Sequence, residues 1–356
     1  MKTDKILKTA QGMLKLPAFF PDATYGHVIG LSSKDLRDCK IDGVIVNIFH
    51  LLRSRLIKEI ERKGGIHNYM KFFKPIISDS GGFQVMSLIH DNPKLGRISR
   101  DKIIFNSDGK EIVLTPEKCI QLQIRIGTDV IMCLDDCTRP NVSKSEQEKS
   151  VDRTIRWARE CKKEFERLTK KMSKKPLIFS IIQGGQDEKL RKKCAEKLLK
   201  IGFDGYSFGG WPIHNGELVE KMLKYVAKLI PDDKTKYAMG IGKPQDIVKC
   251  VKLGYNMFDC VLPTRDARHR RLYIFNRKLN QKNIFNKKIY GTISIREKYA
   301  GNNKKASKFC DCYSCRNYNI ADLYRLFRAK DNLARRLATI HNLRNYSLLM
   351  SALRKK

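Results

Sequence analysis

The sequence predicts an α/β fold, a (β/α)₈ TIM-like barrel followed by a smaller C-terminal subdomain. Short apolar runs alternate with amphipathic helical stretches from about residue 40 to residue 265. The runs are apolar on both faces, which is typical of buried parallel strands. Several runs end in polar or glycine residues, and no GxGxxG fingerprint accompanies them. Because barrel strands bring their carboxyl ends to one mouth, these endings favour a closed barrel over a doubly wound open sheet.

Seven runs are expected to be barrel strands. They span residues 43–47, 75–79, 129–135, 177–183, 205–209, 237–240 and 257–262. Five of them end in Asp79, Asp135 with Asp136, Gln183, Gly209 with Gly210, and Asp259. A single polar strand end is ordinary, but five in register predict a site at the mouth of the barrel.

The segments between the runs carry helix signals. Thr115 followed by Pro116 predicts a helix start, and Gly127 predicts its end. Proline and glycine bound a second helix over residues 244–254, and the charged stretch 143–171 is helical by composition.

One insertion is expected to interrupt the barrel. Apolar triplets flank an Asp108-Gly109 turn, which predicts a β-hairpin near residues 98–114. The barrel pattern ends after Tyr273, where a basic segment begins. We therefore expect a barrel domain over residues 1–272 and a basic subdomain with closing helices over residues 273–356.

The composition is that of a globular protein with a large basic excess. The 356 residues include 72 Lys and Arg against 37 Asp and Glu, and 42% are apolar. No run approaches the ~18 apolar residues of a membrane span, and the N-terminus leads into no apolar signal core. We expect a soluble, cytoplasmic protein without a membrane partner.

The basic excess has two explanations. Residues 266–356 hold 23 Lys and Arg against 5 Asp and Glu, about half of the net charge of +35. This concentration favours a polyanionic partner, most simply nucleic acid. A Lys-biased genome is the alternative, and Lys pairs along the chain agree with it.

Eleven cysteines are scattered along the chain, and eight of them stand alone, as small core residues do. The other three form Cys310-x-Cys312-x₂-Cys315, and His341 follows farther along. Three thiolates and one imidazole complete a tetrahedral Zn²⁺ site with no open position, so we expect one structural zinc per chain. Reduced cysteines without a metal are the alternative.

Two strand-end aspartates predict chemistry at a sugar carbon. Asp79 opens the segment Asp-Ser-Gly-Gly-Phe-Gln, and Asp259 lies in an apolar strand, where a carboxylate is costly to bury. One carboxylate attacks the anomeric carbon and the other protonates the leaving group. A capped turn at Asp79 and an ion pair between Asp259 and Arg265 are the alternatives.

Six ordered motifs resemble those of tRNA-guanine transglycosylases, from Pro17 to Asn342. They are residues 79–84 (DSGGFQ), 183–185 (QGG), 205–210 (GYSFGG), 239–243 (MGIGK), 257–265 (MFDCVLPTR) and the Cys₃His set. The resemblance implies exchange of the wobble guanine in tRNA anticodons for a 7-deazaguanine base, by a covalent ping-pong route in queuosine biosynthesis. It also implies an irregular barrel with the zinc subdomain near its C-terminus, and a homodimer.

The resemblance also implies residue roles. Asp259 is the nucleophile and Asp79 the general acid/base. The edge and faces of the base are expected to meet Ser80, Phe83, Asp135, Gln183, Gly209, Gly210 and Met239. By resemblance the RNA backbone is expected to meet Arg265 and Arg268, and the basic surplus after Asp266 adds Arg270 and Arg271.

The chain departs from the family pattern in the loop after Gly210. The usual Leu-Ala-Val-Gly-Glu is replaced by Trp-Pro-Ile-His-Asn-Gly-Glu over residues 211–217, two residues longer. The side chains of Ile213 and Cys137 are expected to limit the space for the substituent at position 7 of the incoming base. A β-branched Ile213 favours 7-aminomethyl-7-deazaguanine over queuine.

Other departures concern assembly and RNA binding. Residues 316–322 lack the Ser-Arg-Ala-Tyr/Phe run that helps a dimer to form, and residues 266–271 are unusually basic. A catalytically silent tRNA-binding subunit and the same base exchange on DNA are the alternative functions. Retention of both Asp79 and Asp259 speaks against the first, and the Cys₃His set speaks against the second.

Overall fold

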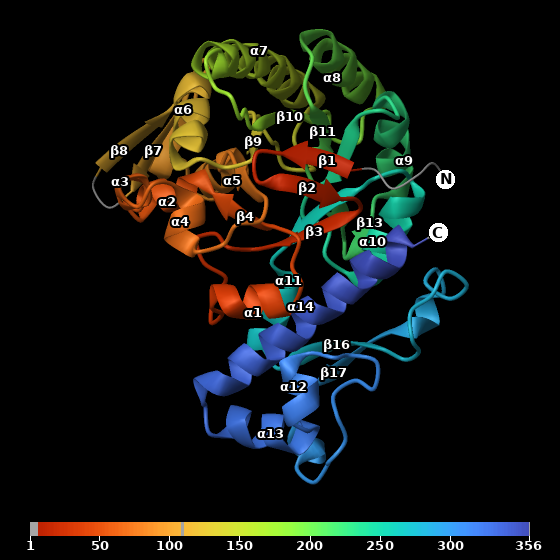
Figure 1. Ribbon diagram of the computed structural model, residues 1–356. Helices are drawn as coiled ribbons and strands as arrows, with labels where there is room; N and C mark the ends of the chain where they lie inside the picture. The colour runs from red at the N-terminus through yellow and green to blue at the C-terminus, as the bar shows by residue number, and fades with distance from the viewer. Residues whose placement is uncertain (1–5, 108–109, 356) are drawn as a thin grey trace.

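Eight parallel strands form a ring in the computed structural model, which describes residues 6–107 and 110–355 (Figure 1). They are β3 (Ala18–Pro21), β4 (Val44–Asn47), β5 (Ile76–Asp79), β9 (Val130–Met132), β10 (Leu177–Ile182), β11 (Gly205–Phe208), β14 (Thr235–Ala238) and β15 (Met257–Cys260). The strand order is β3-β15-β14-β11-β10-β9-β5-β4, and a parallel bridge from Asp22 to Ile45 joins the two ends. The TIM-like barrel predicted from the sequence is therefore confirmed.

An N-terminal hairpin covers one end of the ring. Its strands are β1 (Ile6–Thr9) and β2 (Gly12–Lys15), which lie across the barrel in Figure 1. Leu14 and Leu16 pack with the inward-facing side chains of the barrel strands. The amide of Gln11 donates to Asp129 Oδ1 (2.9 Å), directly before β9. Because this hairpin closes the amino end of the strands, the carboxyl end is left to carry the site.

Helices surround the ring (Figure 1). They are α1 (Ser33–Asp38), α2 (Ile48–Arg53), α3 (Ile57–Arg62), α4 (Ile66–Met70), α5 (Gly82–Asp91), α6 (Pro116–Ile126), α7 (Lys144–Thr169), α8 (Glu188–Ile201), α9 (Glu220–Leu229) and α10 (Pro244–Lys252). The three predicted helices are confirmed as α6, α7 and α10. Thr115 caps α6 by accepting from the amide of Lys118 (3.2 Å), and Gly127 ends it at φ 75°.

The predicted hairpin insertion is a three-stranded antiparallel sheet. Its strands are β6 (Gly96–Ile98), β7 (Ile103–Ser107) and β8 (Lys110–Leu114), with a 3₁₀ turn at Pro93–Leu95 before them. The predicted Asp108-Gly109 turn lies outside the described residues. A small hairpin of β12 (Ile213–His214) and β13 (Glu217–Leu218) follows β11.

The C-terminal segment packs against the barrel through one long helix. Its elements are α11 (Leu262–Arg268), β16 (Arg271–Phe275), β17 (Tyr290–Ser294), α12 (Tyr313–Asn317), α13 (Ile320–Arg328) and α14 (Asn332–Arg354), with 3₁₀ turns at Lys287–Ile289 and Glu297–Tyr299. Asn342 on α14 donates to the carbonyls of Pro263 (2.9 Å) and Arg271 (3.0 Å). It also accepts from the amide of Tyr273 (2.9 Å). These bonds hold α11 and β16 to α14.

The closing helices around His341 are two. α13 ends at Arg328, α14 begins after the capping residue Asp331, and His341 lies within α14. Of the helices in the described ranges, none combines the length and the apolarity that crossing a membrane requires.

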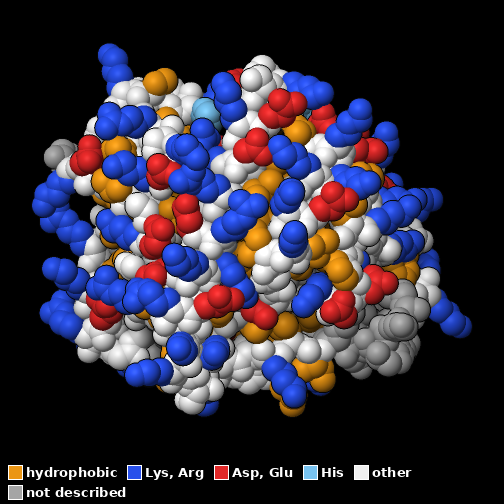
Figure 2. Space-filling view, turned by 90° about the horizontal axis from the view of Figure 1, so that it is seen from above, with side chains coloured by type: hydrophobic (Ala, Val, Ile, Leu, Met, Phe, Trp, Pro, Cys, Tyr) orange, Lys and Arg blue, Asp and Glu red, His pale blue; other side chains and the backbone are white. Residues whose placement is uncertain are grey.

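Basic side chains are not confined to the C-terminal segment. Figure 2 shows Lys and Arg over the face that carries α7 and α8, with Asp and Glu between them. Some of these charges are paired, such as Arg156 with Asp101 (2.9 Å) and Lys193 with Asp152 (2.5 Å). Net charge alone therefore does not locate a binding surface.

Candidate active site

The carboxyl ends of the barrel strands enclose a cavity of about 460 Å³. The predicted site residues that line it are Asp79, Phe83, Asp135, Gln183, Gly209, Gly210, Met239 and Asp259. Cys137 and Ile213 line it as well. Ser80 does not; it is buried, and its hydroxyl accepts from the amide of Gly82 (3.2 Å).

Asp79 is the last residue of β5 and is buried. Asn47, at the end of the neighbouring β4, donates its amide to Asp79 Oδ2 (2.8 Å). Burial, together with the nearby charge of Asp259, raises the pKa of Asp79 to about 6. This carboxyl group can therefore be protonated or ionised near neutral pH, as a general acid/base must be.

Asp259 lies on β15 and is held through one of its two oxygens. The hydroxyl of Tyr237 donates to Oδ1 (2.7 Å), and the amide of Gly240 donates to the same oxygen (3.0 Å). Burial raises the pKa of Asp259, and these two hydrogen bonds oppose that rise. The alternative ion pair with Arg265 is wrong, because that guanidinium lies 3.9 Å from Asp266 instead.

Asp135 and Gln183 form a hydrogen-bonded pair on the wall of the cavity. Gln183 Nε2 donates to Asp135 Oδ2 (2.6 Å). Burial raises the pKa of Asp135 to about 7, and the Gln183 hydrogen bond opposes the rise. Gly209 lies against this pair: a Cβ there would lie 2.6 Å from Gln183 Nε2, so only glycine fits. The pair offers hydrogen-bonding groups that can recognise the edge of a planar ligand.

Aromatic side chains form part of the rim. The rings of Phe83 and Trp211 lie edge to face with centroids 5.3 Å apart. Trp211 Nε1 donates to the carbonyl of Thr138 (3.0 Å), so this loop is fixed over the cavity. No motif in the sequence indicates a role for Trp211 or Tyr237. An aromatic residue with a polar tip inside a buried run was the available signal for Tyr237.

The Cys₃His set is brought together in the C-terminal segment. Cys310, Cys312, Cys315 and His341 are all buried, and their ligand atoms lie within 4.8 Å of one another. Cys315 Sγ lies 3.2 Å from His341 Nδ1. His341 Nε2 lies 2.8 Å from the carbonyl of Tyr273, which orients the ring toward the thiols. This group can hold a metal ion, and its composition fits a zinc site.

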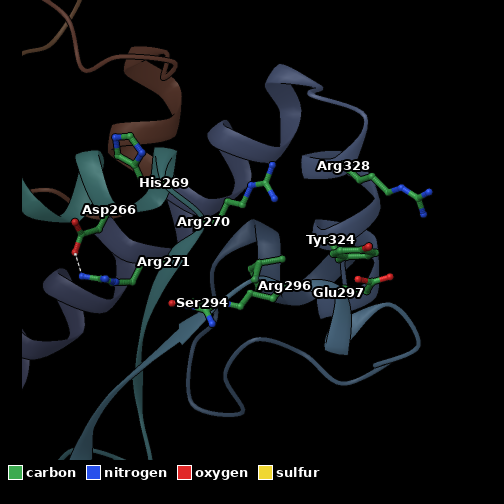
Figure 3. Close-up of a pocket in the computed structure, with 10 residues that line it drawn as sticks. Asp266, His269, Arg270, Arg271, Ser294, Arg296, Glu297, Tyr324 and Arg328 are labelled. Atoms are coloured by element: carbon green, nitrogen blue, oxygen red, sulfur yellow. Dashed lines mark ion pairs between the residues drawn. The ribbon is translucent and has the colours of Figure 1, made fainter.

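The four predicted RNA-binding arginines lie within seven residues of chain. Arg265 and Arg268 are on α11, and Arg270 and Arg271 follow it. Arg265, Arg270 and Arg271 are exposed, whereas Arg268 is partly buried, with its Nη1 atom unpartnered. Arg271 lies 3.6 Å from Asp266 (Figure 3).

Comparison with known proteins identifies the family. Residues 5–356 match the family model described as queuine tRNA-ribosyltransferase. The queuine tRNA-ribosyltransferase of Psychrobacter sp. (strain PRwf-1) is 39% identical over 349 residues, 96% of this chain and 86% of that protein. The one from Shewanella baltica (strain OS155) is 40% identical over 97% of this chain and 87% of its own length. The chain therefore belongs to the queuine tRNA-ribosyltransferase family, whose members are pentosyltransferases.

Proposed function

We propose that this protein is a tRNA-guanine transglycosylase, which exchanges the wobble guanine of tRNA anticodons for a 7-deazaguanine base. The observation that carries the proposal is the pair of carboxylates, buried Asp79 and half-buried Asp259, in a cavity that also holds the Asp135–Gln183 pair. A glycosidic bond needs a nucleophile and an acid, and a base needs a polar edge to be read.

The proposed reaction has two displacement steps. The Oδ2 atom of Asp259 attacks C1′ of the ribose, and the bond from C1′ to the guanine nitrogen breaks. Neutral Asp79 gives its proton to that nitrogen, so guanine leaves uncharged. The incoming base then loses its proton to ionised Asp79 and attacks C1′, which releases Asp259. Tyr237 and the Gly240 amide hold Oδ1 and stabilise the ionised nucleophile.

The same residues account for base recognition in this proposal. Asp135, Gln183 and the backbone at Gly209 and Gly210 meet the edge of the base. Phe83 and Met239 enclose its faces, and Ser80 supports the loop beneath it. Ile213 and Cys137 line the cavity and favour the smaller 7-aminomethyl-7-deazaguanine as the incoming base.

The Cys₃His set is proposed to hold one structural Zn²⁺. All four donors are protein side chains, so no position is left for a substrate. Cys310 and Cys312 precede α12, Cys315 lies within it, and His341 belongs to α14. A bound ion would fix the C-terminal segment on the helix that packs against the barrel.

Replacing Asp259 by Ala should abolish formation of a covalent RNA adduct, because the nucleophile is lost. The measurement is a denaturing gel of the protein incubated with unmodified tRNA. The Asp79→Ala variant should fold but release guanine at least a hundred-fold more slowly, since guanine is a poor leaving group without a proton. A covalent adduct that still forms with the Asp259→Ala variant would contradict the assignment of Asp259 as the nucleophile.

The Asp79→Asn variant should be inactive and yet more stable at alkaline pH. A folded-state pKa of about 6, above the usual 3.8, means that the unfolded chain loses the Asp79 proton first, so stability falls as the pH rises from about 3.8 to about 6. The penalty is about 3 kcal/mol at pH 8 and fades as the pH falls from 6 toward 3.8. Urea unfolding at pH 5 and pH 8 measures it.

Asp129 provides the matched control for this experiment. It is buried at the opposite end of the ring, where it accepts from the amides of Gln11 (2.9 Å) and Ile76 (2.8 Å). Asp129→Asn should therefore lower the free energy of unfolding at both pH values. A loss of stability in Asp79→Asn at pH 8 would contradict the proposed role of burial.

Elemental analysis should find one zinc per chain, and Cys312→Ser should lower both the zinc content and the melting temperature. The reason is that metal-binding energy is folding energy for such a segment. Cys250→Ser, at a buried cysteine of α10 outside the set, should keep its zinc. Stoichiometric zinc loss with an unchanged melting temperature would show that the metal is not structural.

A further inference from the structure

A further carboxylate lines the cavity at the barrel mouth and has no part in the proposed reaction. Asp22 directly follows β3, is half-buried, and lines the same cavity as Asp79 and Asp259. The parallel bridge from Asp22 to Ile45 closes the barrel at this point, and the amide of Ala23 donates to the carbonyl of Ile45 (2.8 Å). The backbone that carries this carboxylate is therefore held in place by the barrel itself.

The strand pairing places Asp22 beside the proposed nucleophile. β3 pairs with β15 in parallel, and Phe20 lies opposite Asp259 in the register. Phe20 packs with side chains of the barrel interior, and alternation along the strand turns Asp22 toward the same interior. Neighbouring strands lie roughly 5 Å apart and two residues advance roughly 7 Å, so Asp22 lies one step nearer the mouth than Asp259. Burial raises the pKa of Asp259, and the charge of Asp22 adds to that rise.

One oxygen of Asp22 is occupied by its own turn, and the other has no protein partner. Oδ1 accepts from the amide of Thr24 (3.0 Å) and from the Thr24 hydroxyl, which fixes the orientation of the carboxylate. Among residues 6–107 and 110–355, none donates a hydrogen bond to Oδ2 and no cation forms an ion pair with Asp22. An oriented carboxylate oxygen without a donor, in a substrate cavity, is a hydrogen-bond acceptor available to the substrate.

The stereochemistry of a ribonucleoside decides which substrate group this acceptor meets. The base lies on one face of the sugar ring, and the 2′- and 3′-hydroxyls lie on the opposite face. A nucleophile that displaces the base in line must approach C1′ from the face that carries the hydroxyls. A carboxylate beside Asp259 therefore faces the sugar hydroxyls, and the 2′-hydroxyl is the one on the carbon next to C1′.

We propose that Asp22 accepts a hydrogen bond from the ribose 2′-hydroxyl of the exchanged nucleotide and thereby selects RNA over DNA. This inference rests on the proposed function and deepens it, because it names the sugar group that the site recognises. The 2′-hydroxyl is what distinguishes RNA from DNA at a single nucleotide. Hydrogen bonds to the hydroxyl next to the reacting carbon strengthen as positive charge develops on the sugar, so Asp22 contributes more in the transition state than in the bound substrate.

The test uses two anticodon stem-loop RNAs that differ only in the exchanged nucleotide, which is guanosine in one and 2′-deoxyguanosine in the other. The measured quantity is the ratio of their kcat/KM values for guanine release, in wild type and in variants, so the intrinsic reactivity of the two sugars cancels. The ratio should fall about ten-fold or more in Asp22→Ala, the effect of one hydrogen bond to a charged group. Asp22→Asn keeps an oxygen for Thr24 and should give a smaller fall, since neutral hydrogen bonds are weaker. Asp233→Asn, at an exposed position before β14, is the matched control and should leave the ratio unchanged.

Binding measured without turnover separates this inference from the proposed reaction. In an Asp259→Asn background, which forms no adduct, the RNA with guanosine should bind more tightly than the RNA with 2′-deoxyguanosine, and adding Asp22→Ala should remove that difference. If folded Asp22→Ala and Asp22→Asn proteins leave both the kcat/KM ratio and the binding difference unchanged, the role of Asp22 is overturned and the exchange reaction stands. A binding difference that depends on Asp22, in a wild-type protein that exchanges no base, would refute only the proposed reaction.

Discussion

Closing eight parallel strands into a ring forces their carboxyl ends to share one small mouth, and the site depends on this constraint. Asp79 ends β5 and Asp259 lies on β15, and both are removed from water by the side chains around them. Desolvation and mutual repulsion raise the pKa of Asp79 into the range in which it can exchange a proton. Tyr237 counteracts the same effect at Asp259. Desolvation at the same barrel mouth is thus compatible with a different role for each of the two carboxylates.

The long helix α14 connects this mouth to the rest of the protein. It carries His341 of the Cys₃His set, it holds α11 through Asn342, and its last turn reaches the first barrel strand through Arg354 and the carbonyl of Pro17 (2.9 Å). α14 therefore links the Cys₃His set to α11, which begins three residues after Asp259.

Much of this architecture could be predicted because its signals lie in short continuous stretches of the sequence. Seven strands carry long apolar runs, and the cysteine spacing limits the ligand set. β3 was not predicted, because prolines bound its four residues, Ala18–Pro21, and proline argues against a central strand. β14 begins two residues before the predicted run, because Lys236 is buried in a strand and satisfied by the carbonyl of Ala227 (2.7 Å). Trp211 and Phe83 are far apart in the sequence, so no motif spacing could predict the contact between their rings.

The proposed activity is the exchange of a base on RNA by the two carboxylates Asp79 and Asp259. The most direct measurement uses unmodified tRNA whose wobble guanine is labelled, incubated with the protein and with guanine, 7-aminomethyl-7-deazaguanine or queuine in turn. We expect release of label with guanine and with the aminomethyl base, and slower release with queuine, because Ile213 lines the cavity. Retention of the label with all three bases, by a folded protein that binds the tRNA, would contradict it.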